Sequence, residues 1–248
     1  FPEMVVIVTA EERIDWVIES GVQIIETSGR SPGPYRQQIV DAGLIHIHKC
    51  ARVRDAVKMD GLGLDLISVV GTECGGHPSM EEVTTLALIP TVLDKITTPL
   101  IAGGGFADGK GLMAALALGA SAVNFGTRFL ATQECPAHPN IKQLLVDSSE
   151  TDTVLVMKTL NNPGRVLKTP GALKVIELES QGAGIEELAP YISGKTALIG
   201  WQTGEIDKGL YDAGQVMGRI NDIPTVAELI DRIVGEAVVV KKNLDALF

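Results

Sequence analysis

The 248-residue sequence is poor in cysteine, in aromatic residues and in basic charge, and each shortage excludes a class of protein. The three cysteines, at positions 50, 74 and 135, are too few for a disulfide framework or a four-ligand zinc site, which is typical of a protein from the reducing cytoplasm. Asp and Glu number 31 against 21 Lys and Arg, so the formal charge of −10 excludes the basic surface of a nucleic-acid-binding protein. Aromatic residues are only 4% of the chain while glycines number 27, a balance that suits tight strand-to-helix turns better than a β-sandwich.

Long hydrophobic runs are also missing. The longest stretch without a charged residue covers residues 111–127, and glycines, a serine and an asparagine interrupt it. It is too short and too polar to cross a membrane as a helix, and no secretory signal is recognised, so no membrane partner is expected. Hydrophobic residues nevertheless make up 45% of the chain, which is ample for a packed core and argues against disorder.

Short apolar or β-branched runs recur along the first half of the chain, most of them about 20 residues apart. They predict parallel strands at residues 4–9, 22–27, 44–49, 64–70, 99–103 and 122–125. Helical patterns between them predict helices at residues 11–20, 31–42, 53–62 and 109–118, each ending just before a glycine that suits a C-cap.

This alternation of strand and helix predicts an α/β fold with a parallel sheet, either closed as a TIM (β/α)8 barrel or open and doubly wound. Because a strand-like run already begins at residue 4, we expect two βα units upstream, which would make these strands the third to eighth of a barrel. Prolines and asparagines break residues 131–210 into short helical pieces without a strand pattern. We therefore predict a barrel from residues 1–130 and 211–248, closed by a helix at 226–247, and a helical insertion or cap domain at 131–210.

Two neighbouring strand ends carry glycine-rich turns of the kind that bind phosphate. Gly103, Gly104 and Gly105 end one predicted strand, and Gly126 and Thr127 follow the next. Backbone without side chains lets N–H groups approach an anion, and a following helix N-terminus adds a favourable dipole. The two turns together predict a phosphorylated ligand, the alternative being glycines that only make tight turns.

The longest loop between a predicted strand and helix holds His77 beside Gly75, Gly76 and Pro78. A stiff, open backbone at the carboxyl edge of a sheet would let the imidazole face a ligand and act as a general base near neutral pH. The alternative is a loop histidine that is hydrogen-bonded to backbone. His77 is the candidate catalytic residue.

Lys49 ends a predicted strand, where alternation places it on the same face as Ile45 and Ile47. If that face lies inside a barrel, the ammonium reaches the barrel mouth, where it could neutralise an anionic ligand or form a Schiff base. The alternative is a solvated lysine at a strand end. His46 and His48 share the opposite face and are predicted to be hydrogen-bonded beneath a helix.

The remaining candidates carry weaker signals. Cys74 lies near His77 along the chain, but no second thiol or suitably spaced histidine makes it a nucleophile, and all three cysteines are predicted to be small buried residues. His138, between two prolines, is predicted at the surface. Gln202, in a glycine-flanked segment at 200–204, and the segment 211–215 could cap a ligand, the alternative being simple turns.

Four separated motifs together resemble a known family. Residues 73–78 are ECGGHP, residues 102–109 are AGGGFADG, residues 125–132 are FGTRFLAT and residues 213–215 are AGQ. In this order and spacing they resemble the nitronate monooxygenases, formerly called 2-nitropropane dioxygenases, from about residue 22 to the C-terminus. The pattern is also similar to bacterial NADH:quinone reductases and to flavin-type enoyl-ACP reductases.

The resemblance implies a TIM barrel that binds FMN at its carboxyl rim, next to a small helical domain. It implies that the glycine turns at 103–105 and 126–127 hold the FMN phosphate and that Gly75 and Gly76 let the backbone approach the isoalloxazine. Lys49 would lie near the flavin ring, where a cation favours the anionic reduced form. Gln202 is taken as a further cofactor contact, and His77 as the catalytic base or the group that orients the substrate.

Some positions depart from the family pattern. The family's first two βα units, with a Gln-Gly-Gly-type loop that contacts FMN, have no counterpart in this sequence. Val70 and Thr72 stand where the quinone reductases tend to have Asp and Phe, and Ser79 replaces a glycine often found after the His-Pro pair.

The reaction implied by the resemblance is the oxidative denitrification of an alkyl nitronate or nitroalkane. The FMN takes an electron from the nitronate, and O₂ completes the conversion to a carbonyl compound and nitrite, while His77 removes the carbon-bound proton of a neutral nitroalkane or hydrogen-bonds the nitronate oxygens. One alternative passes electrons from NADH through the flavin to a quinone. Others are a lyase or isomerase that uses Lys49 covalently, and a catalytically silent barrel used in assembly. Pairing into a homodimer is a further expectation.

Overall fold

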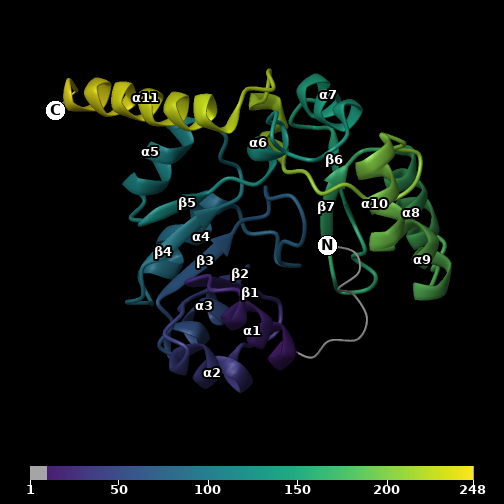
Figure 1. Cartoon of the computed structure of the whole chain (residues 1–248). Helices are drawn as coiled ribbons and strands as arrows, with labels where there is room; N and C mark the ends of the chain where they lie inside the picture. The colour runs from purple at the N-terminus through teal and green to yellow at the C-terminus, as the bar shows by residue number, and fades with distance from the viewer. Residues whose placement is uncertain (1–9, 248) are drawn as a thin grey trace.

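The computed structural model describes residues 10–247, so the strand predicted at 4–9 lies outside the described residues. Within them, five parallel strands form one sheet in the order of the sequence (Figure 1). The strands are β1 (Ile24–Ser28), β2 (Ile45–Cys50), β3 (Leu66–Val70), β4 (Leu100–Gly103) and β5 (Ala122–Asn124). Their bounds agree with the predicted ones to within two residues, and the α/β class with a parallel sheet is confirmed.

Helices alternate with these strands. They are α1 (Ala10–Glu19), α2 (Arg36–Asp41), α3 (Val53–Asp60), α4 (Thr85–Leu93) and α5 (Gly109–Ala117). The helix predicted at 31–42 is shorter than expected and begins with the 3₁₀ turn η2 (Gly33–Tyr35), because a residue that precedes proline disfavours the α conformation and Pro32 and Pro34 lie here. The four glycines predicted as C-caps all have a left-handed φ, between 66° and 99°.

One face of the sheet is buried against α3, α4 and α5. Ile67 and Val69 of β3 and Leu100 of β4 have no exposed surface and belong to the core between sheet and helices. The opposite face is less covered, since Ile24 and Ile45, which are paired across β1 and β2, are 56% and 42% exposed. In the described part of the chain the sheet therefore has one open face and two edges, β1 and β5, and does not close into a barrel.

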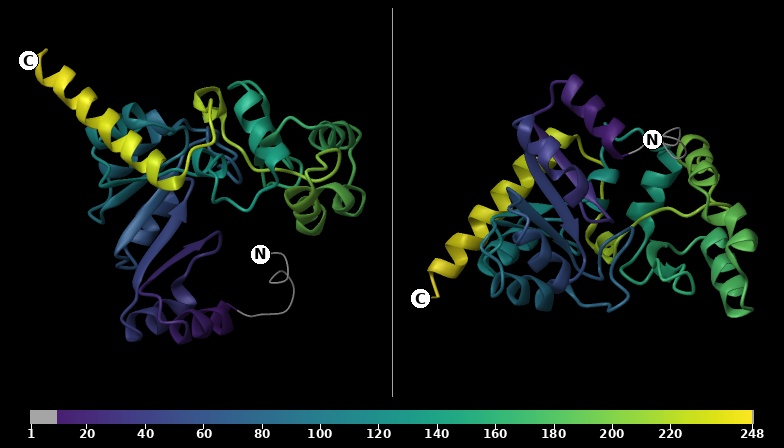
Figure 2. Two further views of the ribbon diagram at one scale, coloured as in Figure 1. Left: turned by 45° about the horizontal axis from the view of Figure 1, so that its top comes forward. Right: turned by 90° about the horizontal axis from the view of Figure 1, so that it is seen from below.

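The predicted C-terminal helix is confirmed as α11 (Val226–Asp245), which packs against α5. Gly109 permits this contact, because a Cβ there would lie 2.4 Å from the backbone nitrogen of Ala237. The N–H of Gly109 also donates to Glu236 Oε2 at 2.9 Å. Both views of Figure 2 place α11 on the opposite side of the molecule from α8–α10. Between residues 10 and 247, no helix combines the length and hydrophobicity needed to cross a bilayer.

The prediction that residues 131–210 contain no strands was wrong. This segment holds an antiparallel hairpin of β6 (Thr153–Val156) and β7 (Gly164–Leu167). Each strand has four residues and β7 is buried throughout, so no alternation of polar and apolar residues marks it in the sequence. The surrounding elements are α6 (Thr127–Leu130), α7 (Pro139–Asp147), α8 (Pro170–Ser180), α9 (Ile185–Ile192) and α10 (Gly194–Thr203), followed by η3 (Gln215–Arg219).

His46 and His48 on β2 are buried, as predicted, and both are hydrogen-bonded to the neighbouring strand β1. The hydroxyl of Thr27 lies 2.8 Å from His46 Nε2 and 2.7 Å from His48 Nδ1, while His46 Nδ1 has no partner in the described part of the chain. Burial, together with the nearby charges of Arg36 and His48, lowers the pKa of His46 to about 4. Burial also lowers the pKa of His48. Both rings are therefore neutral at pH 7.

We expect the free energy of unfolding to fall by up to about 3 kcal/mol, from His46 alone, as the pH is lowered from about 7 to about 4. The folded chain keeps His46 unprotonated in this window, whereas the unfolded chain protonates it below about 6.5, so acid favours unfolding. Urea unfolding at a series of pH values measures the slope. The variant His46→Gln should reduce the dependence of the unfolding free energy on pH, whatever the variant's own stability. An unchanged slope would contradict the low pKa of His46.

Candidate functional site

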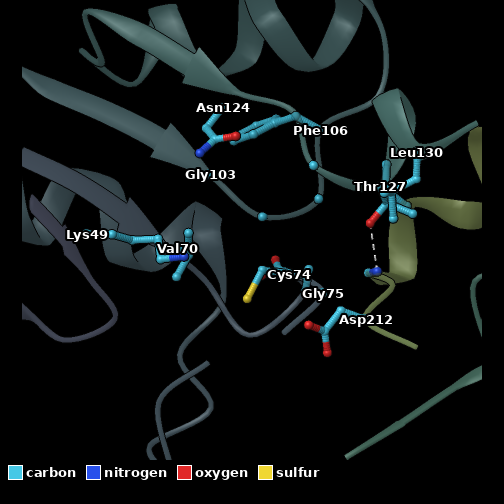
Figure 3. Close-up of a pocket in the computed structure, with 16 residues that line it drawn as sticks. Lys49, Val70, Cys74, Gly75, Gly103, Phe106, Asn124, Thr127, Leu130 and Asp212 are labelled. Carbon is cyan, nitrogen blue, oxygen red and sulfur yellow. Dashed lines mark hydrogen bonds between the residues drawn. The ribbon is translucent and has the colours of Figure 1, made fainter. Parts of the chain in front are cut away.

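The carboxyl ends of the strands surround a cavity of about 230 Å³, here called the glycine-lined cavity (Figure 3). Residues at the ends of β2, β3, β4 and β5 form one wall, and the segment 212–216 forms another. The structure brings together seven of the predicted cofactor-binding residues here: Lys49, Gly75, Gly103, Gly104, Gly105, Gly126 and Thr127. The two glycine turns predicted from the sequence thus face the same space.

These turns offer backbone N–H groups that have no partner in the rest of the described chain. The N–H groups of Gly104, Gly105, Gly126 and Thr127 donate no hydrogen bond within residues 10–247. Unpaired N–H groups from two adjacent turns that line one cavity offer hydrogen-bond donors to an anion or to water. Because α6 has only four residues, the second turn gains little from a helix dipole.

Packing explains why these turns are made of glycine. Gly104 has a φ of +94°, and a Cβ there would lie 3.0 Å from Thr85 Oγ1. A Cβ on Gly103 would lie 2.9 Å from Val70 Cγ1. By contrast, a Cβ on Gly126 would meet nothing within 4 Å. The first turn is therefore wedged between strand ends, whereas the second faces open space.

Glu73 fixes the loop that follows β3, a role that sequence reasoning missed. Its carboxylate accepts hydrogen bonds from the backbone N–H of Thr85 at 2.9 and 3.1 Å, at the start of α4. The hydroxyl of Thr85 lies 2.9 Å from Glu73 Oε2 and 3.0 Å from the carbonyl oxygen of Gly104. The N–H of Gln215 donates to the carbonyl of Glu73 at 3.0 Å. Glu73 lines the cavity, but its charge is already engaged in capping α4.

The AGQ motif forms the far wall of the glycine-lined cavity. The N–H of Gly214 donates to Thr127 Oγ1 at 2.9 Å, the hydrogen bond drawn in Figure 3. Gly75 packs directly on this segment, because a Cβ on Gly75 would lie 2.8 Å from the carbonyl carbon of Ala213. The glycine at position 75 is therefore needed to bring residues 213–214 against the loop after β3.

Strand β7 connects the two walls, which gives the unpredicted hairpin a clear role. Gly76 and Arg165 exchange two backbone hydrogen bonds, at 3.0 and 2.6 Å, and Val166 forms an antiparallel bridge with Asp212. The Arg165 side chain is 7% exposed, and its Nε donates to the carbonyl oxygen of Thr72 at 2.8 Å. Gly76, a predicted cofactor contact, thus holds the loop to β7 and does not itself line the cavity.

Asp212 is a second residue that sequence reasoning missed. Its carboxylate lies in the glycine-lined cavity, with Oδ2 3.6 Å from where a Cβ on Gly76 would be (Figure 3). Desolvation by the surrounding protein raises its pKa, and electrostatic interactions with His77 and Lys49 offset part of that rise. The sequence showed only an acid in a glycine-flanked segment, and no spacing rule connects position 212 to position 49.

Besides Gly76, two predicted site residues do not line the glycine-lined cavity. His77 is exposed and lines a second cavity, which adjoins the first because Lys49 and Val70 line both. Gln202 is exposed and lines neither cavity, so the structure does not bring it to the site. The segment 200–204 is the end of α10 rather than a loop, and its Trp201 packs on Tyr211 at a ring separation of 5.5 Å.

The predictions for the cysteines and for His138 concern burial. Cys50 and Cys74 are buried, as predicted, and burial raises the pKa of Cys50 to about 12 and that of Cys74 to about 11, which disfavours the reactive thiolate. Cys135 is partly exposed, so the prediction of burial was wrong for it. His138 is partly exposed and caps α7, because its Nδ1 accepts a hydrogen bond from the N–H of Asn140 at 3.2 Å.

The sequence of this chain is similar to those of a known protein family. A family model described as nitronate monooxygenase matches residues 3–236. The (3aS,4S,5R,7aS)-5-hydroxy-7a-methyl-1-oxo-octahydro-1H-indene-4-carboxyl-CoA dehydrogenase of Rhodococcus jostii RHA1 is 31% identical, over 96% of this chain and 76% of its own. A probable nitronate monooxygenase of Bacillus subtilis 168 is 36% identical, over 58% of this chain and 44% of its own.

A solved structure agrees with these sequence matches. The structure of FabK from Thermotoga maritima superimposes with a TM-score of 0.90 at 33% identity, over 96% of this chain and 75% of FabK. The family model covers most of the chain, and the matched region includes both glycine turns and the AGQ motif. This chain therefore belongs to the nitronate monooxygenase family and is an oxidoreductase, and its relatives support a flavin as the cofactor.

Proposed function

We propose that the protein is an FMN-dependent nitronate monooxygenase, which converts an alkyl nitronate or nitroalkane and O₂ into a carbonyl compound and nitrite. The observation that carries this proposal is the pair of glycine turns, whose unpartnered N–H groups line one cavity together with Lys49. Membership of the family supplies the class of reaction.

The residues of the cavity fit a phosphate-bearing flavin. The N–H groups of the turns at 103–105 and 126–127 would hold the phosphate. Figure 3 shows Lys49 on the opposite side of the cavity from Thr127, so its ammonium would supply positive charge at the other end of the site. Phe106 and Val216 add apolar surface to the walls. Bound FMN would supply the electron transfer between substrate and O₂.

The protein's own part in the reaction is to handle a proton and to position the substrate. His77 would take the proton from the α-carbon of a neutral nitroalkane, or would donate a hydrogen bond to the oxygens of a nitronate. Asp212 competes with His77 for the role of base, because its carboxylate lies in the glycine-lined cavity itself. A preformed nitronate needs no base, which makes the two substrates separable in an assay.

The proposal is tested by loading the protein with FMN and measuring nitrite released from the nitronate of 2-nitropropane in air. We expect flavin absorbance in the purified holoenzyme and nitrite formation that depends on the nitronate. A protein that binds no flavin but forms a borohydride-trapped adduct at Lys49 would instead support a lyase or isomerase.

A flavin-dependent reductase or dehydrogenase is the second candidate. It is favoured by the similarity to FabK and to a CoA dehydrogenase, both over 96% of this chain. Rapid anaerobic bleaching of the bound flavin by NADH, with no nitrite released from nitronate in air, would select this candidate, including its quinone-reducing form.

We also propose that β1–β5 are five strands of an eight-stranded barrel and that residues 131–210 form its cap. The open face of the sheet and its two edges support this arrangement, because exposed apolar pairs such as Ile24 and Ile45 are normally covered in a folded domain.

A further inference from the structure

Arg165 of β7 is a buried cation without a carboxylate partner. The residue is 7% exposed, and its side chain forms no ion pair within residues 10–247. Burial lowers the pKa of Arg165, because removing a charged group from water costs free energy. Apolar residues often replace buried charged groups without loss of stability, so stability alone does not explain this residue.

The guanidinium connects the loop after β3 to the hairpin. Its Nε donates to the carbonyl oxygen of Thr72 at 2.8 Å, and its Nη1 donates to Thr153 Oγ1 on β6 at 3.0 Å. The backbone of the same residue exchanges two hydrogen bonds with Gly76, at 2.6 and 3.0 Å. Arg165 therefore holds the loop at two points, on either side of Gly75, which lines the glycine-lined cavity.

The middle of this loop has no other backbone hydrogen bond. Within the described chain, the backbone of residues 75–78 forms only the two hydrogen bonds with Arg165. Further along the loop, an exposed ion pair joins Glu82 to Lys158, and exposed pairs contribute little because water screens them. His77 lies in this middle segment, so its placement depends on Arg165.

Strand β7 also fixes the other candidate for the base. Val166, which follows Arg165, forms the antiparallel bridge with Asp212. The carboxylate of Asp212 interacts electrostatically with His77, and this interaction offsets part of the rise in the pKa of Asp212. Two successive residues of one strand therefore set the separation between the two candidates.

We propose that Arg165 is a positioning residue, which sets the separation between His77 and Asp212 for removal of the carbon-bound proton of a nitroalkane. Its side chain lines neither cavity, so it acts through the loop and not by contact with the substrate. In this step the base takes the proton and the C–H electron pair moves into the nitro group, which gives the nitronate without an oxidant. The inference rests on the proposed function and adds a residue that this function does not yet use.

The first measurement is hydrogen exchange of the loop at residues 72–83 in the purified protein, which requires no turnover. Arg165→Met keeps a long side chain but removes the donors to Thr72 and Thr153. We expect the amide of Gly76, which donates to the carbonyl of Arg165, to exchange about tenfold faster in this variant. Arg165→Lys keeps the charge and one donor and should restore most of the protection.

The second measurement separates positioning from a general loss of stability. In Arg165→Met we expect kcat for a neutral nitroalkane to fall about tenfold to hundredfold, because small displacements of a catalytic group are costly. Turnover of the preformed nitronate, which needs no base, should stay within about twofold of the unchanged protein.

The matched control is Lys142→Met. Lys142 of α7 is also a buried cation, 8% exposed, and it donates to the backbone carbonyl of Gln133 at 3.0 Å and lines neither cavity. Its replacement removes the same charge and should lower stability without faster exchange of the loop. Thr153→Val removes only the acceptor of Arg165 Nη1, so it should speed exchange of the loop by about threefold and provides the test if Arg165→Met does not fold.

The role of Arg165 is overturned if the loop exchanges no faster in Arg165→Met than in Lys142→Met. It is also overturned if Arg165→Met slows turnover of both substrates equally. Because hydrogen exchange involves no substrate, it tests the positioning even in a protein that releases no nitrite. Failure of this inference is therefore distinguishable from failure of the proposed monooxygenase reaction.

Discussion

Replacing Gly104 with alanine is expected to weaken FMN binding about a hundredfold, which corresponds to about 3 kcal/mol. The residue has a φ of +94°, which strains any L side chain, and the added Cβ would lie 3.0 Å from Thr85 Oγ1 and 3.1 Å from the backbone of Gly71. The turn must shift to relieve these contacts, and its N–H groups would then no longer converge on a phosphate. Titration of the flavin-free variant with FMN, followed by flavin fluorescence, measures the loss.

The matched control is Gly63→Ala. Gly63 also has a left-handed φ, of +66°, but a Cβ there would meet nothing within 4 Å and the residue lines neither cavity. This variant should lose stability through the same backbone strain while keeping its FMN affinity within about twofold of the unchanged protein. Equal losses of affinity in the two variants would show that the effect comes from destabilisation and that the turn does not hold the cofactor.

The variant His77→Asn is expected to lower kcat/KM for a neutral nitroalkane by about a hundredfold to ten-thousandfold while largely sparing the preformed nitronate. The physical reason is that only the neutral substrate has a carbon-bound proton to remove. Steady-state nitrite release with each substrate measures the split. His138→Asn is the control, because this histidine caps α7 and lines neither cavity.

The companion variant Asp212→Asn decides which group accepts the proton. If Asp212→Asn abolishes nitroalkane turnover and His77→Asn does not, the base is the carboxylate, whose pKa the surrounding protein raises. If either variant loses activity with both substrates equally, the replaced residue positions the substrate or the cofactor and is not the base.

Much of the fold could be predicted because local signals agreed with the final packing. The alternation that placed Lys49 on one face of β2 and His46 on the other is present in the structure, where the strand alternates between buried and more exposed residues. The two glycine turns were found because parallel strands bring successive carboxyl ends to one edge: Gly103 is paired with Asn124, and the turns that follow line one cavity.

The remainder of the site depends on contacts between residues that are far apart in the sequence, and the periodicity of the sequence does not predict such contacts. Glu73 caps a helix that begins at Thr85, and Asp212 reaches the cavity because β7 aligns its backbone through Val166. Gln202 was predicted to lie in a loop because flanking glycines are typical of loops. Its segment instead ends helix α10.

The glycine-lined cavity draws its walls from residues as far apart in the chain as Lys49 and Val216. A ribosome synthesises the five parallel strands well before it reaches the segment that closes the far wall. A nascent chain would therefore display both glycine turns while still lacking the AGQ motif that encloses them. A cofactor bound between these walls would accordingly be enclosed only after residues 212–216 are made, and folding of the site is slowed by pairings between residues of large sequence separation.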